Sequence, residues 1–267
     1  MKKEFLRTAI EAAKRAGEVI LNSLGKISKE DIRLKKTADF VTSVDRESER
    51  IIISTIKDRF PYHLILAEES LKEAETEQFR WIIDPLDGTT NFIHQYPVFS
   101  VSIALEYQKG IILGVIFDPL REELYSAEKG KGAFLNGRPI TLSHVRDFGD
   151  SLVTTGFPFR RKEFIDLYLE LFKNVFLKVS DLRRAGSAAL DLAYLACGRC
   201  EGFFEIGLSP WDIAAGEIMI KEAGGIVTDF DGGGDYLSTG NIVAGTPFVH
   251  EKILREVKKV FGGVIDK

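Results

Sequence analysis

The feature that most constrains this chain is the stretch at residues 81–92, which reads Trp-Ile-Ile-Asp-Pro-Leu-Asp-Gly-Thr-Thr-Asn-Phe. Its first three residues are large and apolar, which predicts a buried strand that delivers Asp84 at its end. Pro85 restricts its own φ angle, so we expect the chain to turn there and to bring Asp87 back to the side of Asp84. Two carboxylates beside a buried strand are costly unless a cation or hydrogen-bond donors pair with them.

The residues that follow Asp87 favour an anion next to these carboxylates. Gly88 permits a close approach of the backbone, and Thr89 and Thr90 can begin a helix whose N–H groups bind a phosphate. Acidic side chains repel a phosphate unless a divalent cation lies between them, and hard oxygen ligands favour Mg²⁺. The whole stretch therefore predicts a magnesium and phosphate site, although each aspartate taken alone is better explained by a surface turn or a helix cap.

Other known motifs do not fit the acidic and glycine-rich stretches. Phosphatases of the haloacid dehalogenase type need Asp-x-Asp, whereas Asp84 and Asp87 are three residues apart, so a phospho-aspartate intermediate is disfavoured. Residues 130–132 do not supply a Walker A loop. Residues 229–235 resemble the start of a calcium loop, but Gly240 stands where an EF-hand needs Glu. The predicted chemistry is direct in-line attack of a metal-activated water on a phosphomonoester.

Three further carboxylates are candidates to complete the site. Glu68 follows the apolar run Leu64–Ala67 as Asp84 follows its own run, and a solvated acidic loop explains it equally well. Asp212 immediately precedes a helix of small residues, where one carboxylate can cap the helix and also face a ligand. Asp45 opens another helix, and by itself it is better explained as a charge at the helix N-terminus.

Composition and charge narrow the classes of function. The chain of 267 residues can form one large domain or two intimate lobes, and its formal charge of −4 gives no overall attraction for nucleic acid. Two cysteines and four scattered histidines do not build a zinc site. The apolar stretches fall short of the ~18 residues of a membrane span, and no secretory signal is evident. We expect a cytoplasmic protein with no membrane partner and no direct nucleic-acid partner.

Hydrophobic patterning predicts a mixed fold, with an α+β lobe over residues 1–145 and an α/β lobe over residues 146–267. The first lobe should contain two amphipathic helices joined by a mobile loop at residues 35–39, followed by a largely antiparallel sheet. The expected helices of this lobe are near 6–24 and 45–60, and its strands fall between 64 and 135. The second lobe should have strands at 152–155, 202–206, 226–229 and 242–245, and helices at 162–176, 187–196, 213–223 and from 247 onward.

Two long segments resemble the signatures of a known family. Residues 81–94 (WIIDPLDGTTNFIH) are similar to the first signature of the inositol monophosphatase family, and residues 211–225 (WDIAAGEIMIKEAGG) are similar to its second signature. Residues 183–206 resemble the bacterial inositol-1-monophosphatase branch in particular, and the similarity extends over nearly the full chain. The resemblance implies a layered αβαβα sandwich of two intimate lobes, as in sugar phosphatases.

The resemblance also implies two or three Mg²⁺ ions and assigns their ligands. Glu68 belongs to the first metal and is shared with the third, and Asp84 belongs to the first and the second. The third metal lies near Lys36 on the expected mobile loop. The full set of metal ligands is Glu68, Asp84, the backbone carbonyl of Leu86, Asp87 and Asp212.

Roles around the substrate follow from the same resemblance. Asp45 and Thr89 are the pair that, with Glu68, orients the attacking water, which makes these three the predicted catalytic residues. The N–H groups of Gly88 and Thr89 would hold the phosphate. The full substrate-binding set, on the phosphate and alcohol sides together, is Asp87, Gly88, Thr89, Gly186, Ser187, Ala188, Glu205 and Asp212.

We predict a Mg²⁺-dependent phosphomonoesterase that hydrolyses myo-inositol monophosphate. The alcohol stays open, since relatives also hydrolyse fructose 1,6-bisphosphate and nucleotide phosphates. For a bisphosphate, Arg183 or Arg184 would bind the second phosphate, although a structural or interface role suits them better. The alternative of another class is an accessory protein in transcription or RNA processing, because some bacterial relatives have regulatory roles. Family members usually dimerise, and the aromatic residues at 157–176 are compatible with a homodimer.

Overall fold

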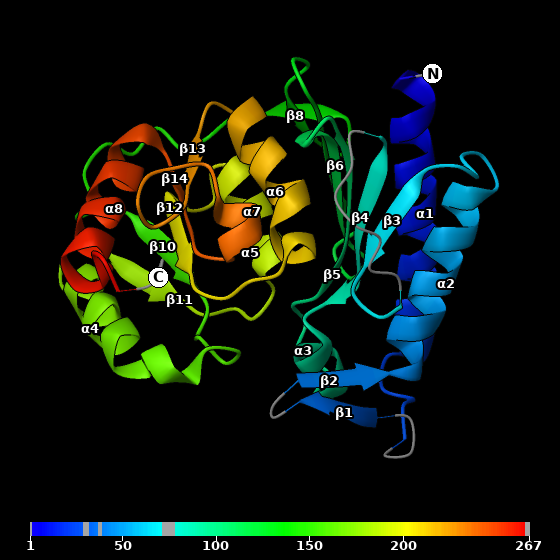
Figure 1. Cartoon of the computed structure of the whole chain (residues 1–267), viewed down its shortest axis with the longest axis horizontal. Helices are drawn as coiled ribbons and strands as arrows, with labels where there is room; N and C mark the ends of the chain where they lie inside the picture. Colours follow the sequence, from blue (N-terminus) through cyan, green and yellow to red (C-terminus); the bar gives the residue numbers. More distant parts are fainter. Residues whose placement is uncertain (1, 29–31, 37–38, 71–77, 265–267) are drawn as a thin grey trace.

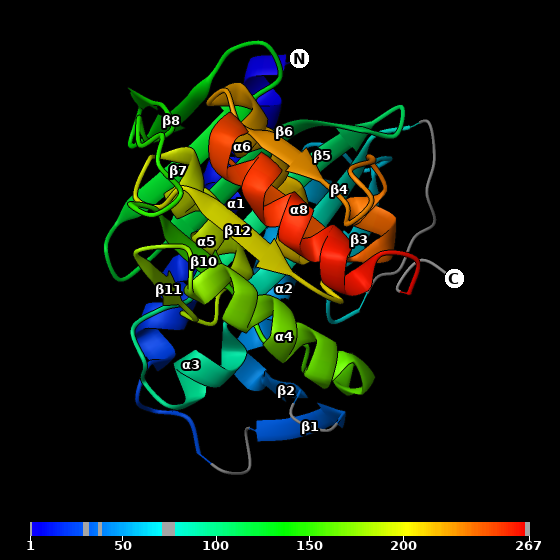
Figure 2. The ribbon, with the colours of Figure 1, turned by 90° about the vertical axis from the view of Figure 1, so that its left-hand side faces the viewer.

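The computed structural model describes residues 2–28, 32–36, 39–70 and 78–264 of the chain. These residues form five layers in the order helices, sheet, helices, sheet, helices (Figure 1). The layered αβαβα fold expected from the sequence is therefore confirmed. Figure 2 shows the same layers from one end, with the last helix of the chain in front.

The first helical layer consists of α1 (Lys2–Ser23) and α2 (Ser43–Lys57), which cover one face of the large sheet. Both helices bury an apolar stripe, as the spacing of their isoleucines and alanines predicts. Thr42 caps α2, because its side chain accepts from the backbone N–H groups of Val44 and Asp45. Because of this cap, α2 begins at Ser43, two residues before the predicted start at residue 45.

The large sheet has seven strands in the order β3-β4-β5-β6-β7-β8-β9, with β3 parallel to β4 and every other pair antiparallel. The two-residue turns of the β5–β6 and β8–β9 hairpins lie at Gln108-Lys109 and Asn136-Gly137. All four residues have positive φ, which is the geometry that two-residue hairpins favour. The strands are β3 (Leu64–Ala67), β4 (Arg80–Asp87), β5 (Ser100–Tyr107), β6 (Gly110–Asp118), β7 (Glu123–Glu128), β8 (Ala133–Leu135) and β9 (Arg138–Ile140).

The middle layer holds α5 (Ala188–Ala196) and α6 (Pro210–Glu222) between the two sheets. A helix that is apolar on all sides must be buried on all sides, and residues 212–220 of α6 are all buried. Gly114 in β6 lets α6 approach the large sheet, since a Cβ at this position would lie 2.6 Å from the carbonyl oxygen of Ala215. The N-termini of α5 and α6 lie at the end of the large sheet where β4 has its C-terminal end.

The second sheet has five strands in the order β11-β10-β12-β14-β13, and α4 (Ile165–Phe176) and α8 (Pro247–Phe261) cover its outer face. β10 is parallel to β11 and β12, whereas β14 is antiparallel to both of its neighbours. Its strands are β10 (Leu152–Thr155), β11 (Asp181–Arg183), β12 (Gly202–Glu205), β13 (Ile226–Thr228) and β14 (Ile242–Gly245).

Several local predictions were wrong. Most of the segment 35–39, predicted as a loop, belongs to a β-ribbon of β1 (Ile32–Lys36) and β2 (Asp39–Thr42), while residues 37 and 38 lie outside the described residues, so the mobility stays a prediction. The helix expected at 162–176 opens as a 3₁₀ turn, η2 (Lys162–Phe164), before α4. Short elements such as β9, β11 and α7 (Tyr236–Thr239) were missed because so few residues show no periodicity.

Two predictions about the whole chain have different outcomes. Within the part of the chain that the structure describes, no helix has both the length and the apolar character needed to cross a bilayer. The division into lobes near residue 145 falls between β9 of the large sheet and β10 of the second sheet. That division stays a prediction about domain organisation.

Candidate active site

The two aspartates of the first acidic motif both lie on β4. The strand was predicted to carry Asp84 at its end, but it continues through Pro85 to Asp87. Asp84 pairs with Ser102 of β5 and Asp87 with Ser100, so three steps along β4 oppose two along β5, which is a β-bulge. Because side chains alternate along a regular strand, the extra residue is what brings both carboxylates to one side.

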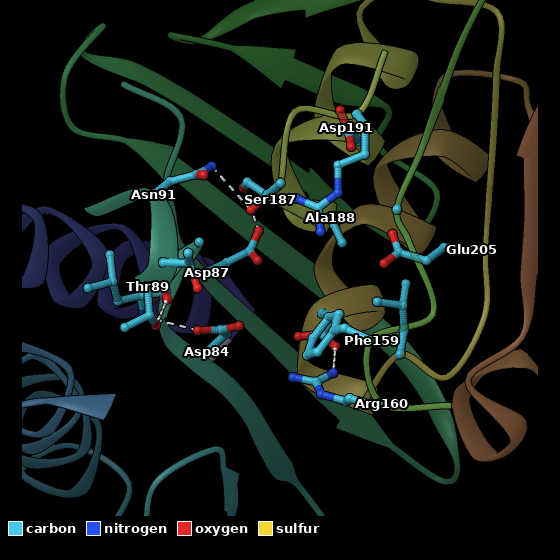
Figure 3. Close-up of a pocket in the computed structure, with 18 of the residues that line it drawn as sticks. Asp84, Asp87, Thr89, Asn91, Phe159, Arg160, Ser187, Ala188, Asp191 and Glu205 are labelled. Carbon is cyan, nitrogen blue, oxygen red and sulfur yellow. Dashed lines mark hydrogen bonds and ion pairs between the residues drawn. The ribbon is translucent and has the colours of Figure 1, made fainter. Parts of the chain in front are cut away.

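Three buried carboxylates converge beside this bulge. One carboxylate oxygen from each of Asp84, Asp87 and Asp212 lies within 4.8 Å of the other two. Asp84 and Asp87 come from the large sheet, whereas Asp212 comes from the first turn of α6 in the middle layer. Figure 3 shows Asp84 and Asp87 pointing into the pocket from the large sheet. All of these donors are oxygens, the type that Mg²⁺ prefers.

Burial and mutual repulsion change the ionisation of these acids. Burial, followed by the charges of Glu68, Asp87 and Asp212, raises the pKa of Asp84 well above its usual value. Burial and then Asp212 raise the pKa of Asp87 to about 7, although hydrogen bonds from Ser187 and Ala189 lower it. Repulsion of this kind is relieved when a cation lies between the acids.

Asp87 also joins the two sides of the pocket. Ser187 Oγ, the N-cap of α5, donates to Asp87 Oδ2 at 2.5 Å, and the backbone N–H of Ala189 donates to the same oxygen at 2.8 Å. One carboxylate oxygen of Asp87 is therefore held by the middle helical layer. These two bonds fix α5 relative to β4 at the site.

Asp212 caps its own helix and faces the pocket at the same time. The helix α6 begins at Pro210 and not after Asp212 as predicted, so Asp212 is its third residue and Ser209 is its N-cap. Asp212 Oδ2 accepts from the N–H of Ser209 at 2.7 Å and from Arg160 Nη1 at 2.8 Å. Asp212 can therefore cap α6 and also face a ligand in the pocket, which are the two roles predicted for it.

Thr89 connects the pocket to α2. This residue is the first of the short helix α3 (Thr89–Ile93), and Gly88 before it has φ of 95°. Thr89 Oγ1 donates to Asp45 Oδ1 at 2.8 Å, with the carbonyl oxygen of Leu86 at 3.1 Å. Asp45 Oδ2 accepts from the N–H of Thr42 at 2.8 Å, so this buried carboxylate caps α2 and binds Thr89. The explanation of Asp45 as a helix charge alone was therefore incomplete.

These side chains line one pocket with a volume of about 300 Å³. Asp45 does not line the pocket and is connected to it through Thr89. The side chain of Lys36, predicted near the third metal, is not among the described residues. Arg184 is in the lining, whereas Arg183 is not and pairs with the exposed Asp181. The predicted site residues that the pocket brings together are Glu68, Asp84, Leu86, Asp87, Gly88, Thr89, Gly186, Ser187, Ala188, Glu205 and Asp212.

The second sheet supplies the far wall of the pocket (Figure 3). Burial raises the pKa of Glu205 to about 8, although the charge of Arg184 lowers it. Gly156 leaves room for this side chain in its observed position, because a Cβ there would lie 2.0 Å from Glu205 Oε1. A carboxyl group with this pKa is mostly protonated at neutral pH, so it can both donate to and accept from a hydroxyl group.

Sequence reasoning missed a group of residues in this wall. Phe159 and Arg160 follow β10, and Asp191 lies on the buried face of α5. Burial, followed by the charge of Glu205, raises the pKa of Asp191 well above its usual value. The available signal was Gly156 directly after the run 152–155, since Glu68 likewise directly follows the end of a strand.

Comparisons with known proteins agree with this geometry. The model of the inositol monophosphatase family matches residues 1–261. The Nus factor SuhB of Salmonella typhimurium (strain 14028s / SGSC 2262) is 47% identical over 255 residues, which are 95% of this chain and 96% of the relative. The inositol-1-monophosphatase of Mesorhizobium japonicum is 44% identical over 256 residues, 96% of each chain. The solved structure of the extragenic suppressor protein SuhB from Bartonella henselae is 43% identical, with a TM-score of 0.92 over 96% of this chain and 99% of that one.

Proposed function

Because this chain belongs to the inositol monophosphatase family, we propose that it is a Mg²⁺-dependent phosphomonoesterase that hydrolyses myo-inositol monophosphate to inositol and phosphate. The observation that carries the proposal is the convergence of Asp84, Asp87 and Asp212 within 4.8 Å. Such a cluster of buried acids is unfavourable by itself and is stabilised by a divalent cation. The pocket around the cluster has the size and mixed polarity of a small-ligand site.

The oxygen ligands of the cluster fit Mg²⁺, and we propose that two or three ions bind there, as the family resemblance implies. Asp84, Asp87 and Asp212 would hold the ions, with Glu68 and the carbonyl oxygen of Leu86 as further ligands in the same lining. When bound, Mg²⁺ offsets the charge of the acids and of the phosphate, and it lowers the pKa of a bound water.

Thr89 and Asp45 provide a path for a proton. Thr89 donates its hydroxyl hydrogen to Asp45, which leaves the lone pairs of Thr89 Oγ1 to accept a hydrogen bond from a water in the pocket. A proton from that water can pass to Thr89 Oγ1 while the hydroxyl hydrogen of Thr89 moves to Asp45 Oδ1. Glu68, also in the lining, would orient the same water. We assign the catalytic roles to these three residues.

The substrate would lie between the two sheets. Its phosphate would accept hydrogen bonds from the N–H groups of Gly88 and Thr89 at the start of α3. Its alcohol would lie toward the far wall, where Glu205 exchanges hydrogen bonds with hydroxyl groups. The substrate contacts that we propose on this side are Gly186, Ser187, Ala188, Glu205 and Asp212.

Metal removal tests the proposal directly. We expect hydrolysis of inositol-1-phosphate to vanish in EDTA and to return with Mg²⁺, with inversion at phosphorus because no phospho-enzyme forms. The same assay on fructose 1,6-bisphosphate, 3′-phosphoadenosine 5′-phosphate and glycerol 2-phosphate identifies the preferred alcohol. Full activity in metal-free buffer, or a trapped phospho-aspartate, would contradict the mechanism.

An accessory role in transcription is a second candidate function, favoured by the name Nus factor SuhB of a relative at 47% identity. The net charge of −4 argues against direct RNA binding and leaves a protein partner as the form of such a role. Pull-down and gel-shift assays at physiological salt, set beside turnover of inositol-1-phosphate, separate the two candidates.

We also propose that the chain forms a homodimer. The outer side of α4 exposes Ile165, Leu169 and Phe176, and Phe157 is exposed near them. Apolar side chains grouped in this way favour burial against a second copy. Sedimentation at micromolar protein should give about twice the mass of one chain, and a single-chain mass would contradict the proposal.

A further inference from the structure

The buried side of α2 changes from polar to apolar along the helix. Residues 45, 48, 49, 52 and 56 follow helical spacing on one face, and all five are buried. The last two are isoleucines, which pack into the core beneath the large sheet. The first three are Asp45, Ser48 and Glu49, and burying such side chains is costly unless each has a partner.

Each of these polar side chains binds a different segment of the pocket. Asp45 accepts from Thr89 Oγ1, and Ser48 Oγ donates to the carbonyl oxygen of Pro85 at 2.8 Å, between the two aspartates of β4. Glu49 Oε2 accepts from the N–H of Glu69 at 2.8 Å, and Glu49 Oε1 accepts from Ser70 Oγ. The first half of α2 therefore holds three segments that line the pocket on the side of the large sheet: the one after β3, β4 itself and the start of α3.

We propose that Glu49 is a positioning residue that holds Glu68 in the pocket and thereby sets the affinity of the site for Mg²⁺. This inference rests on the proposed function. Glu68 is restrained on two sides, because its own N–H donates to the carbonyl oxygen of Ile83 at 3.2 Å and the next N–H donates to Glu49. Glu68 comes directly after the last pair of the β3–β4 ladder, which joins Ala67 and Ile83.

At position 49 the proposed role depends on the length and hydrogen-bonding groups of the side chain, and not on its charge. A buried carboxylate at Glu49 adds a negative charge close to an already acidic pocket, so its charge is no advantage to the fold. A glutamine has the same length: its Oε1 can accept from the N–H of Glu69, and its Nε2 can donate to Ser70 Oγ. An aspartate keeps the charge but is one methylene shorter, so it cannot reach both groups.

Calorimetric titration of the metal-free full-length protein with Mg²⁺ tests the proposal. Loss of a residue that orients a metal ligand weakens metal binding by about 10- to 100-fold, and we expect this from Glu49→Ala. The matched control is Glu201→Ala, because Glu201 is also a buried glutamate that accepts a backbone N–H, that of Leu152, at 2.7 Å. The control should lose stability in EDTA but keep the wild-type Mg²⁺ affinity.

Two conservative variants keep the test decisive if Glu49→Ala does not fold. We expect Glu49→Gln to keep Mg²⁺ affinity within about threefold of wild type, and Glu49→Asp to lose it as Glu49→Ala does. The reverse order, with Asp restoring and Gln failing, would overturn positioning in favour of a charge effect. Wild-type affinity in both Glu49→Ala and Glu49→Asp would overturn it as well. Failure of the wild-type protein to bind Mg²⁺ would refute the proposed function itself.

Discussion

The acidic pocket and the loop at residues 229–235 both place a buried aspartate near glycines, yet the two regions satisfy their acids in opposite ways. In the loop, Asp229 accepts from three backbone N–H groups, those of Asp231 at 3.0 Å, Gly233 at 2.6 Å and Asp235 at 3.0 Å. In the pocket, Asp84 accepts from the N–H of Leu86, but burial and then the charges of three other carboxyl groups raise its pKa.

The difference separates a structural acid from a functional one. A carboxylate surrounded by the N–H groups of its own loop is complete, and it folds that loop. A group of carboxylates that repel one another is incomplete until a cation arrives, and the fold must bear that cost in the absence of the cation. Substitutions of the pocket acids should therefore lower the activity, whereas substitutions of Asp229 in the loop should lower the stability.

The largest expected effect is that of Asp84→Asn, which removes one charge from the centre of the proposed metal site. We expect kcat to fall about 1,000-fold or more, equivalent to roughly 4 kcal/mol of transition-state stabilisation. The free energy of unfolding in EDTA should not fall, because an asparagine oxygen still accepts from Leu86 and the repulsion is reduced. Turnover at saturating Mg²⁺ and urea unfolding in EDTA measure the two quantities. Turnover within tenfold of wild type would mean that the pocket acids resemble Asp229.

Asp212→Asn should have the next largest effect. We expect a fall in kcat of about 100-fold, or roughly 2.7 kcal/mol, with stability in EDTA nearly unchanged. The asparagine keeps the cap on the N–H of Ser209 and loses only the ion pair with Arg160. Near-native turnover together with a loss of several degrees in Tm would show that Asp212 is only a helix cap.

Asp229→Ala should give the opposite result from the pocket variants. Removing the acceptor of three N–H groups should lower the free energy of unfolding by about 2 kcal/mol and leave kcat unchanged. Asp229→Asn, which keeps one acceptor oxygen, should lose less. Denaturant unfolding measures the stability of both variants, and turnover at saturating Mg²⁺ measures their activity. A large loss of turnover in folded Asp229→Ala would show that the loop and the acidic pocket do not differ in this way.

The smallest effect concerns pH near the loop. His250 Nε2 lies 2.9 Å from Thr228 Oγ1, and burial lowers the pKa of His250 to about 4. The folded state therefore favours the neutral ring, so this contribution to stability is complete above pH 6.5 and is lost as pH falls toward 4. The start of α8 also disfavours a positive charge.

We expect about 1 kcal/mol of stability to be lost between pH 7 and pH 5.5 through this histidine. Urea unfolding of wild type and His250→Gln at both pH values isolates the contribution, because the other titrating groups are common to the two proteins. Equal losses in the two proteins would contradict it.

The parts of the site that could be predicted are those that depend on neighbours in sequence. The apolar run before Glu68 indicated a strand that ends at an acid, and the run before Asp84 indicated the strand that carries this acid, although not where the strand ends. The helix after Ser187 began within one residue of its predicted start. The bulge in β4 could not be predicted, because the pairing with β5 decides how many residues oppose one another. Arg160 was missed for a similar reason, since its partner Asp212 lies on another element.

The sequence by itself determined the fold class, the two acidic motifs and the strand or helix that carries each. These follow from hydrophobic periodicity, turn residues and caps, which act over a few residues. Only the tertiary structure decided which acids meet. Asp212 reaches Asp84 and Asp87 because α6, apolar on nearly all sides, is buried only between two sheets, and Glu49 reaches the segment after Glu68 because α2 packs across β4. Burial of whole elements, a property of the assembled core, sets those distances.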